Sequence, residues 1–199
     1  MIFSSAMIVP LVIALGESGN TAFAFLNALA LTFCSGLLLW LAAQGPKQDL
    51  RIRDGFLITS MFWCVLGCFG SLPFYLSDAT NLTLVAALFE SVSGLTTTGA
   101  TVIAGLDELP KSILFYRQFL QWLGGIGIIV VAVAILPMLG VGGMQLYKAE
   151  TPGPSKDSKL TPRVTETAKV LFLVYLCLTI ACSGAYFWAG MSPFDAICH

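Results

Sequence analysis

Long stretches without a charged residue restrict the folds that this chain can adopt. Residues 23–43, 56–75 and 170–190 contain no charged side chain, and each is close to the roughly 20 apolar residues that cross a bilayer core as a helix. A soluble domain carries about 25% charged residues, whereas this chain is 11% charged and 57% hydrophobic. We therefore predict an all-α membrane protein.

Two further apolar stretches complete the predicted spans. Residues 1–15 are slightly short for a span, and we expect a helix whose first residues are missing. Residues 113–147 would form about 52 Å of helix, more than the roughly 30 Å of a bilayer core. We expect this stretch to cross the membrane and then to break or to run on into the cytoplasm. Places to break are Gly124, Gly125, Gly127, Pro137, Gly140, Gly142 and Gly143.

The first three of these glycines allow two interpretations. They could form a hinge, or they could let two helices pack closely through their small residues.

The basic residues predict the orientation of the five spans. Eight of the ten lysines and arginines lie in the connections 44–54 and 148–169, and cytoplasmic loops carry such an excess. We therefore place both connections in the cytoplasm, residues 76–112 outside, and the N-terminus inside. The eight are Lys47, Arg51, Arg53, Lys148, Lys156, Lys159, Arg163 and Lys169.

Composition argues against several other classes of protein. A net charge of −1 predicts no nucleic-acid surface, and none of the six cysteines forms a C-x-x-C pair. Ser91 and Ser93 lie close to a glycine in a membrane segment, as in an intramembrane serine protease, but such a site needs a neighbouring base. The one histidine, His199, is predicted outside at the chain end, so we predict no enzyme.

Residues 76–112 are too long for a turn and too apolar for an ordinary loop. Thr83 can cap a helix that runs to Ser93, which would be about 16 Å long, or half of a bilayer. We predict a re-entrant half-helix over 83–93.

A threonine-rich segment, Thr96-Thr97-Thr98-Gly99, follows this half-helix. Threonines favour extended backbone, Gly99 can adopt a positive φ, and the helix C-terminus would direct partial negative charge at a cation. Backbone carbonyls can replace the hydration shell of K⁺. The pattern is consistent with a cation filter, and an ordinary turn is the alternative.

Four stretches carry a resemblance to a known family. They are 89–101 (FESVSGLTTTGAT), 116–127 (YRQFLQWLGGIG), 142–147 (GGMQLY) and 167–169 (TAK). From about Phe23 onward the chain resembles the TrkH-type membrane subunit of the Trk potassium uptake family. The resemblance implies four helix–pore-loop–helix repeats around one ion path, preceded by an extra helix pair. It also implies that Thr96, Thr97, Thr98 and Gly99 bind K⁺, mainly through backbone carbonyls.

The resemblance divides the chain into four parts. Residues 1–43 are expected to be the extra helix pair, 56–147 the first repeat, 148–169 a cytoplasmic linker, and 170–199 the start of a truncated second repeat. Pro193 would begin the second pore helix. One filter of four would then be present, so we expect an N-terminal fragment.

Function, partners and location are implied in the same way. The expected function is potassium uptake as the pore-forming subunit. A non-conducting remnant or a membrane interaction subunit is the alternative for a chain with one filter. A whole member is expected to be a homodimer in the bacterial inner membrane, gated by a cytosolic TrkA-like subunit that binds NAD or ATP. This chain has no nucleotide motif, so we expect no cofactor in it, only K⁺ as the transported ion.

Glu90 and Arg117 complete the predicted site. A carboxylate inside an apolar half-helix needs a partner, and Arg117, early in the next span, is the best one available. We predict that the pair, direct or through water, braces the half-helix. The alternative is that Glu90 adds its field to the ion path.

Overall fold

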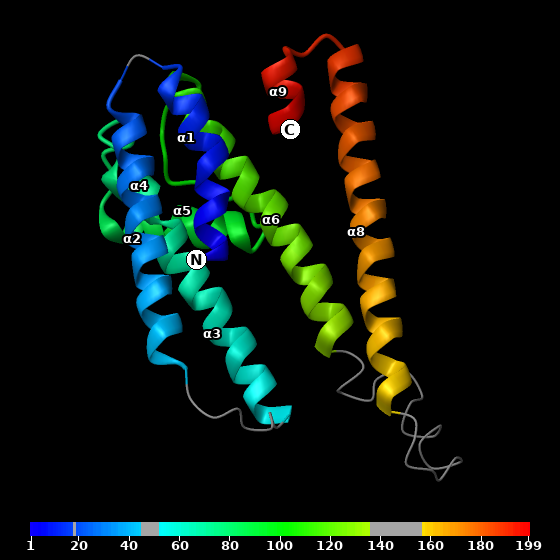
Figure 1. Ribbon diagram of the computed structural model, residues 1–199. Coiled ribbons are helices and arrows are strands. Elements are labelled where there is room, and N and C mark those ends of the chain that lie inside the picture. The colour runs from blue at the N-terminus through cyan, green and yellow to red at the C-terminus, as the bar shows by residue number, and fades with distance from the viewer. Residues whose placement is uncertain (18, 45–51, 136–156) are drawn as a thin grey trace. The chain divides into compact units, whose positions relative to one another are not determined.

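The computed structural model describes residues 1–17, 19–44, 52–135 and 157–199, which form helices and the loops between them, without a strand (Figure 1). This confirms the predicted all-α fold. The residues fall into two compact units, one of Met1–Gly124 with Cys198 and one of Gly125–Ile197 with His199.

The first unit contains the predicted helix pair and the predicted half-helix. In the N-terminal part, α1 and the 3₁₀ helix η1 pack on α2, which in turn packs on α4, and α5 packs on α3 and α4. The elements are η1 Ile2–Met7, α1 Ile8–Leu15, α2 Thr21–Ala42, α3 Ile52–Gly70, α4 Leu72–Leu76, α5 Leu84–Leu95, η2 Leu106–Glu108 and the start of α6 Lys111–Ile135.

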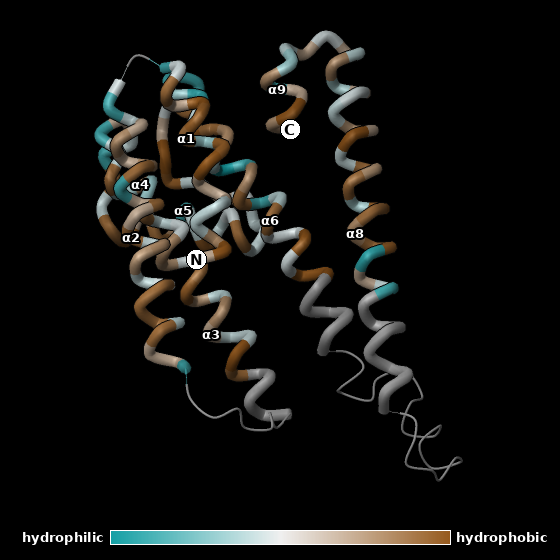
Figure 2. Tube along the Cα trace, viewed as in Figure 1, coloured by the Kyte–Doolittle hydropathy of each residue, from teal (hydrophilic) through white to brown (hydrophobic). Residues whose placement is uncertain are grey.

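Three helical segments of the described residues are long and apolar enough to cross a bilayer. They are Thr21–Ala42, Leu57–Leu76 and Glu166–Trp188, and they match the three predicted charge-free spans. Figure 2 shows hydrophobic residues predominating along α2 and along the part Glu166–Trp188 of α8 (Asp157–Trp188). Ile2–Leu15 is a shorter apolar helix that does not reach this length.

The long apolar stretch predicted over 113–147 is helical as far as its structure is described. Helix α6 runs for 25 residues, Lys111–Ile135, which is about 37 Å at the rise of an α-helix. The predicted break points Pro137, Gly140, Gly142 and Gly143 lie outside the described residues.

The predicted span 56–75 is interrupted near its C-terminal end, because α3 ends at Gly70 and α4 begins at Leu72. Pro73 lies in the first turn of α4. Proline has no N–H to continue a helical ladder, and the first turn of a new helix is where it is tolerated. The interruption leaves the carbonyl of Gly70 to accept a hydrogen bond from Tyr116 Oη at 3.0 Å.

Tyr116 is the largest fully buried side chain of the first unit. Its ring centroid lies 5.4 Å from that of Phe25 on α2 and 5.1 Å from that of Phe74 on α4. Aromatic pairs at such distances add to the stabilisation from burial. The N-terminal helix pair is therefore packed into the core that holds the first turns of α6.

In the second unit, α8 begins at Asp157. This start lies inside the stretch 148–169 that is predicted to be a cytoplasmic linker, and that assignment stays a prediction. Leaving the membrane does not end a helix, because an α-helix satisfies its own backbone groups in water as well as in lipid.

Helix α8 ends in a defined cap. Gly190 has φ +98°, Met191 N–H donates to the Tyr186 carbonyl, and Gly190 N–H donates to the Phe187 carbonyl, which is a Schellman motif. Ser192 then caps the short helix α9, Pro193–Cys198, by accepting a hydrogen bond from Asp195 N at 3.2 Å. A helix therefore begins at the predicted position, Pro193.

Candidate functional site

The predicted half-helix is α5, Leu84–Leu95, 12 residues long. Thr83 caps it as expected, with Oγ1 accepting a hydrogen bond from Ala86 N at 3.3 Å. The helix ends two residues later than predicted. At about 18 Å it is too short to cross a bilayer core of roughly 30 Å.

The threonine-rich segment folds back on the last turn of α5. The N–H groups of residues 96, 97, 98 and 99 all donate to carbonyls of that turn. The acceptors, in order, are Val92, Gly94, Ser93 and again Ser93, at 2.8, 2.9, 2.9 and 3.4 Å. The four amides are thus satisfied within the protein.

The carbonyl groups of the same four residues, unlike their amides, make no hydrogen bond to the described residues. Within the described part of the chain, the oxygens of Thr96, Thr97, Thr98 and Gly99 accept no hydrogen bond, and all four residues are exposed. Glu90, Ser91 and Ser93–Leu95 of the preceding helix are buried. The segment therefore offers a row of carbonyl dipoles, which is the ligand type that K⁺ filters use.

The backbone of this segment is only partly as predicted. Gly99 has φ +73°, as expected. An added Cβ would meet only Gln121 Nε2, at 3.7 Å, so the backbone conformation rather than space requires glycine. The extended backbone expected for the threonines is wrong at Thr96, with φ −83° and ψ 5°, and at Thr97, with φ +56°.

Thr97 is strained for a physical reason. A β-branched residue at positive φ is uncommon and costs about 1–3 kcal/mol. The hydrogen bonds that pin its own amide and those of Thr98 and Gly99 to α5 hold it there. Strain of this kind is concentrated at functional sites.

The threonine side chains are also connected. Thr96 Oγ1 donates to the Val92 carbonyl at 2.8 Å and lies 2.9 Å from Thr98 Oγ1. A hydroxyl has one proton to give, so Thr98 is the donor in the second contact. None of the described residues donates to Thr98 Oγ1, so its lone pairs are available to another ligand.

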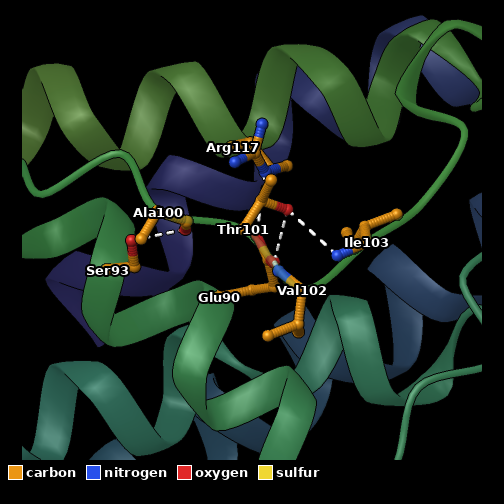
Figure 3. A network of polar contacts seen from close by, with 7 residues as sticks. All are labelled: Glu90, Ser93, Ala100, Thr101, Val102, Ile103 and Arg117. Carbon is orange, nitrogen blue, oxygen red and sulfur yellow. Dashed lines mark hydrogen bonds and ion pairs between the residues drawn. The ribbon is translucent and has the colours of Figure 1, made fainter.

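The structure brings Glu90 and Arg117 into direct contact (Figure 3). Arg117 Nε donates to Glu90 Oε2 at 2.9 Å. The other carboxylate oxygen, Oε1, accepts from Thr101 Oγ1 at 2.6 Å and from Val102 N at 2.7 Å. The carboxylate therefore joins α5, α6 and the chain that follows the threonine-rich segment.

Close packing of α6 on α5 makes this contact possible. A Cβ on Gly124 would overlap the carbonyl group of Leu95, and a Cβ on Gly94 would lie 3.1 Å from Leu120 Cβ. Gly125 is similar in the second unit, where a Cβ would overlap the Tyr175 hydroxyl. For Gly124 and Gly125 the contacts favour close packing over a hinge.

Three contributors to the site had no role predicted from the sequence. Ser93 holds residues 98–100, Thr101 binds Glu90, and Glu17 binds Ser112 at the start of α6. Nothing in the local sequence pattern marks these residues, since each partner lies at least five positions away.

These observations define a class: an all-helical membrane protein in which a helix too short to cross a bilayer is followed by a row of backbone carbonyls that accept no hydrogen bond from the described residues. The profile of the TrkH family, described as "Cation transport protein", matches residues 21–199. The chain belongs to the TrkH family.

Named relatives agree with this assignment. The chain is 57% identical over 198 residues to the Trk system potassium uptake protein TrkH of Vibrio parahaemolyticus, and 55% identical over 199 residues to that of Escherichia coli K12. The crystal structure of the potassium transporter TrkH from Vibrio parahaemolyticus matches with a TM-score of 0.84 at 52% identity, over 100% of this chain and 39% of that one. The chain spans 41% of the length of both curated relatives.

Proposed function

We propose that this chain forms part of the ion path of a potassium uptake protein, with Thr96, Thr97, Thr98 and Gly99 as its K⁺ ligands. One observation carries the proposal: the amides of these residues are fixed to α5, while no described residue donates a hydrogen bond to their carbonyls. The relatives are transport proteins by name, which supports a transport role rather than an enzymatic one.

The domain assignment belongs to the same proposal. Residues 1–43 form the extra helix pair, 56–147 the first pore repeat, and 170–199 the start of a second repeat, with α9 opening its pore helix. Both α5 and α9 follow a hydroxyl cap, at Thr83 and Ser192 respectively.

We further propose an environment for the whole protein. It lies in the bacterial inner membrane with its N-terminus in the cytoplasm, as the basic residues of 44–54 and 148–169 indicate. It acts as a homodimer with a cytosolic TrkA-like subunit that binds NAD or ATP. The relatives' names place them in a Trk system, which is consistent with several components.

Glu90 and Arg117 are proposed to brace the site rather than to face the ion. Their side chains are 0% and 8% exposed, whereas the threonine-rich segment is exposed. A charge that acted on the ion path would be expected nearer to that exposed surface.

A chimaera tests the proposal. In it, this chain replaces the matching segment of Vibrio parahaemolyticus TrkH, in a bacterium that lacks its own potassium uptake systems. The chimaera should restore growth at low external K⁺ and take up K⁺ in preference to Na⁺. A chimaera that inserts in normal amount without K⁺ uptake contradicts the proposal.

The same cells test the alternative, a non-conducting interaction subunit. In this experiment the chain itself, outside the chimaera, is co-expressed with tagged full-length TrkH. Co-purification without any gain in uptake would favour that alternative.

A further inference from the structure

Ser93 contacts three successive residues at the end of the threonine-rich segment. Its carbonyl accepts hydrogen bonds from Thr98 N at 2.9 Å and Gly99 N at 3.4 Å. Its hydroxyl donates to the carbonyl of Ala100 at 2.6 Å (Figure 3). Ser93, which is buried, thus binds both N–H and C=O groups of the backbone that follows α5.

The hydrogen bond from Ser93 to the Ala100 carbonyl distinguishes this carbonyl from the four that precede it. The oxygens of residues 96–99 accept no hydrogen bond from the described residues, whereas that of Ala100 has a short one. A carbonyl held by a buried donor has its direction fixed and its charge partly compensated. Such an oxygen is a poorer ligand for a cation than its free neighbours.

Ser91, two positions earlier on α5, makes no comparable hydrogen bond to the described residues. Ser91 lies on the same helix and is fully buried, but its hydroxyl has no hydrogen-bond partner among the described residues. Of these two buried serines on α5, Ser93 therefore reaches the threonine-rich segment with its hydroxyl and Ser91 does not.

We propose that Ser93 is a positioning residue that ends the row of ion-facing carbonyls at Gly99 and so contributes to ion preference. The inference rests on the proposed function and deepens it. Removing the hydroxyl would release the Ala100 carbonyl, let the peptide between 100 and 101 turn, and alter the spacing of the ligands beside it.

The test compares Ser93→Ala with Ser91→Ala in the chimaera. Each substitution removes one buried hydroxyl from α5, so effects of volume and helix propensity are matched. Two quantities are measured: the ratio of K⁺ to Na⁺ uptake, and the shift in melting temperature of the purified protein on adding K⁺ in place of Na⁺.

We expect Ser93→Ala to lower the K⁺/Na⁺ uptake ratio roughly three- to tenfold, the equivalent of one hydrogen bond, and to reduce the K⁺-specific thermal shift. Ser91→Ala should leave both at the wild-type value. If Ser93→Ala lowers the amount of folded protein, Ser93→Cys gives the second comparison. It keeps a similar shape with a weak donor and should show a smaller change in the same direction.

The outcomes separate the two proposals. A wild-type chimaera that prefers K⁺, with a Ser93→Ala ratio equal to wild type, overturns the role of Ser93 and leaves the proposed function standing. Equal changes in both alanine variants also overturn it. A wild-type chimaera without K⁺ preference in uptake or thermal shift overturns the proposed function, and the inference with it.

Discussion

Arg117 Nε lies 2.9 Å from Glu90 Oε2, and the two side chains are 8% and 0% exposed. The opposite oxygen of the carboxylate holds Thr101 and Val102. A charged hydrogen bond between buried groups is costly to break on one side only, because the remaining charge has no partner. The pair therefore constrains the chain on the C-terminal side of the proposed filter.

Replacing Glu90 by Gln tests this constraint. The variant keeps the shape of the side chain but leaves the Arg117 charge uncompensated, so we expect a loss of about 3–5 kcal/mol in stability. The measurement is the melting temperature and the amount of monodisperse chimaera in detergent. Retained K⁺ preference in the protein that does fold would agree with bracing.

An exposed ion pair supplies the control. Lys169 Nζ lies 3.3 Å from Glu166 Oε1, and these side chains are 69% and 70% exposed. Exposed pairs contribute little, so Glu166→Gln should not change the melting temperature. Normal yield of Glu90→Gln with an altered ion preference would instead support a direct field on the ion path.

A second prediction concerns Gly124. Gly124→Ala places a methyl group against the Leu95 carbonyl at the end of α5, and backbone cannot move aside as a flexible side chain can. We expect a loss of about 1–3 kcal/mol or more from overpacking, seen as a lower melting temperature.

Gly184 in α8 provides a matched position, since a Cβ there has nothing within 4 Å. Gly184→Ala should be neutral or stabilising by about 0.5–1 kcal/mol, because alanine favours helix. Equal melting temperatures for the two variants would show that α5 and α6 are not packed as described.

What the sequence predicts well is local. Spans 23–43 and 170–190 follow from apolar length alone, and Thr83 follows from its position before an apolar run. The contact of Glu90 with Arg117 was predictable because a buried carboxylate needs a partner and few cations were available within the apolar segments.

What the sequence does not predict depends on tertiary contacts. The extended preference of threonine is overridden at Thr97, whose amide closes the end of α5. The bond between Ser93 and Ala100 depends on how the chain turns after the helix. The contact of Glu17 with Ser112 joins residues 95 positions apart, and no periodicity reports such a pairing.

A third prediction follows from that long-range contact. Glu17 accepts from Ser112 N at 3.2 Å and from Ser112 Oγ at 2.6 Å, so it caps the N-terminus of α6 with a favourable charge. Glu17→Ala leaves a buried hydroxyl and a helix N–H without this acceptor. We expect a loss of about 1–2 kcal/mol, measured by thermal melting.

Glu108, in the exposed η2, is the control for removing an acidic residue from the loops. Glu108→Ala should leave the melting temperature unchanged. If Glu17→Ala behaves in the same way, the N-terminal helix pair does not stabilise the first turn of α6.

The last prediction separates the effect of Gly99 on ion preference from the effect of backbone strain on stability. Gly99 and Gly105 have nearly the same φ, +73° and +70°, and at each a Cβ would find its nearest neighbour at 3.7 Å. Alanine at either position should therefore cost a similar amount of stability, about 1–2 kcal/mol for the left-handed backbone. Only Gly99 lies in the threonine-rich segment, so only Gly99→Ala should lower the K⁺/Na⁺ uptake ratio of the chimaera. Since the two variants share the same strain, an equal loss of ion preference in both would mean that residues 96–99 are not the ligands of the transported ion.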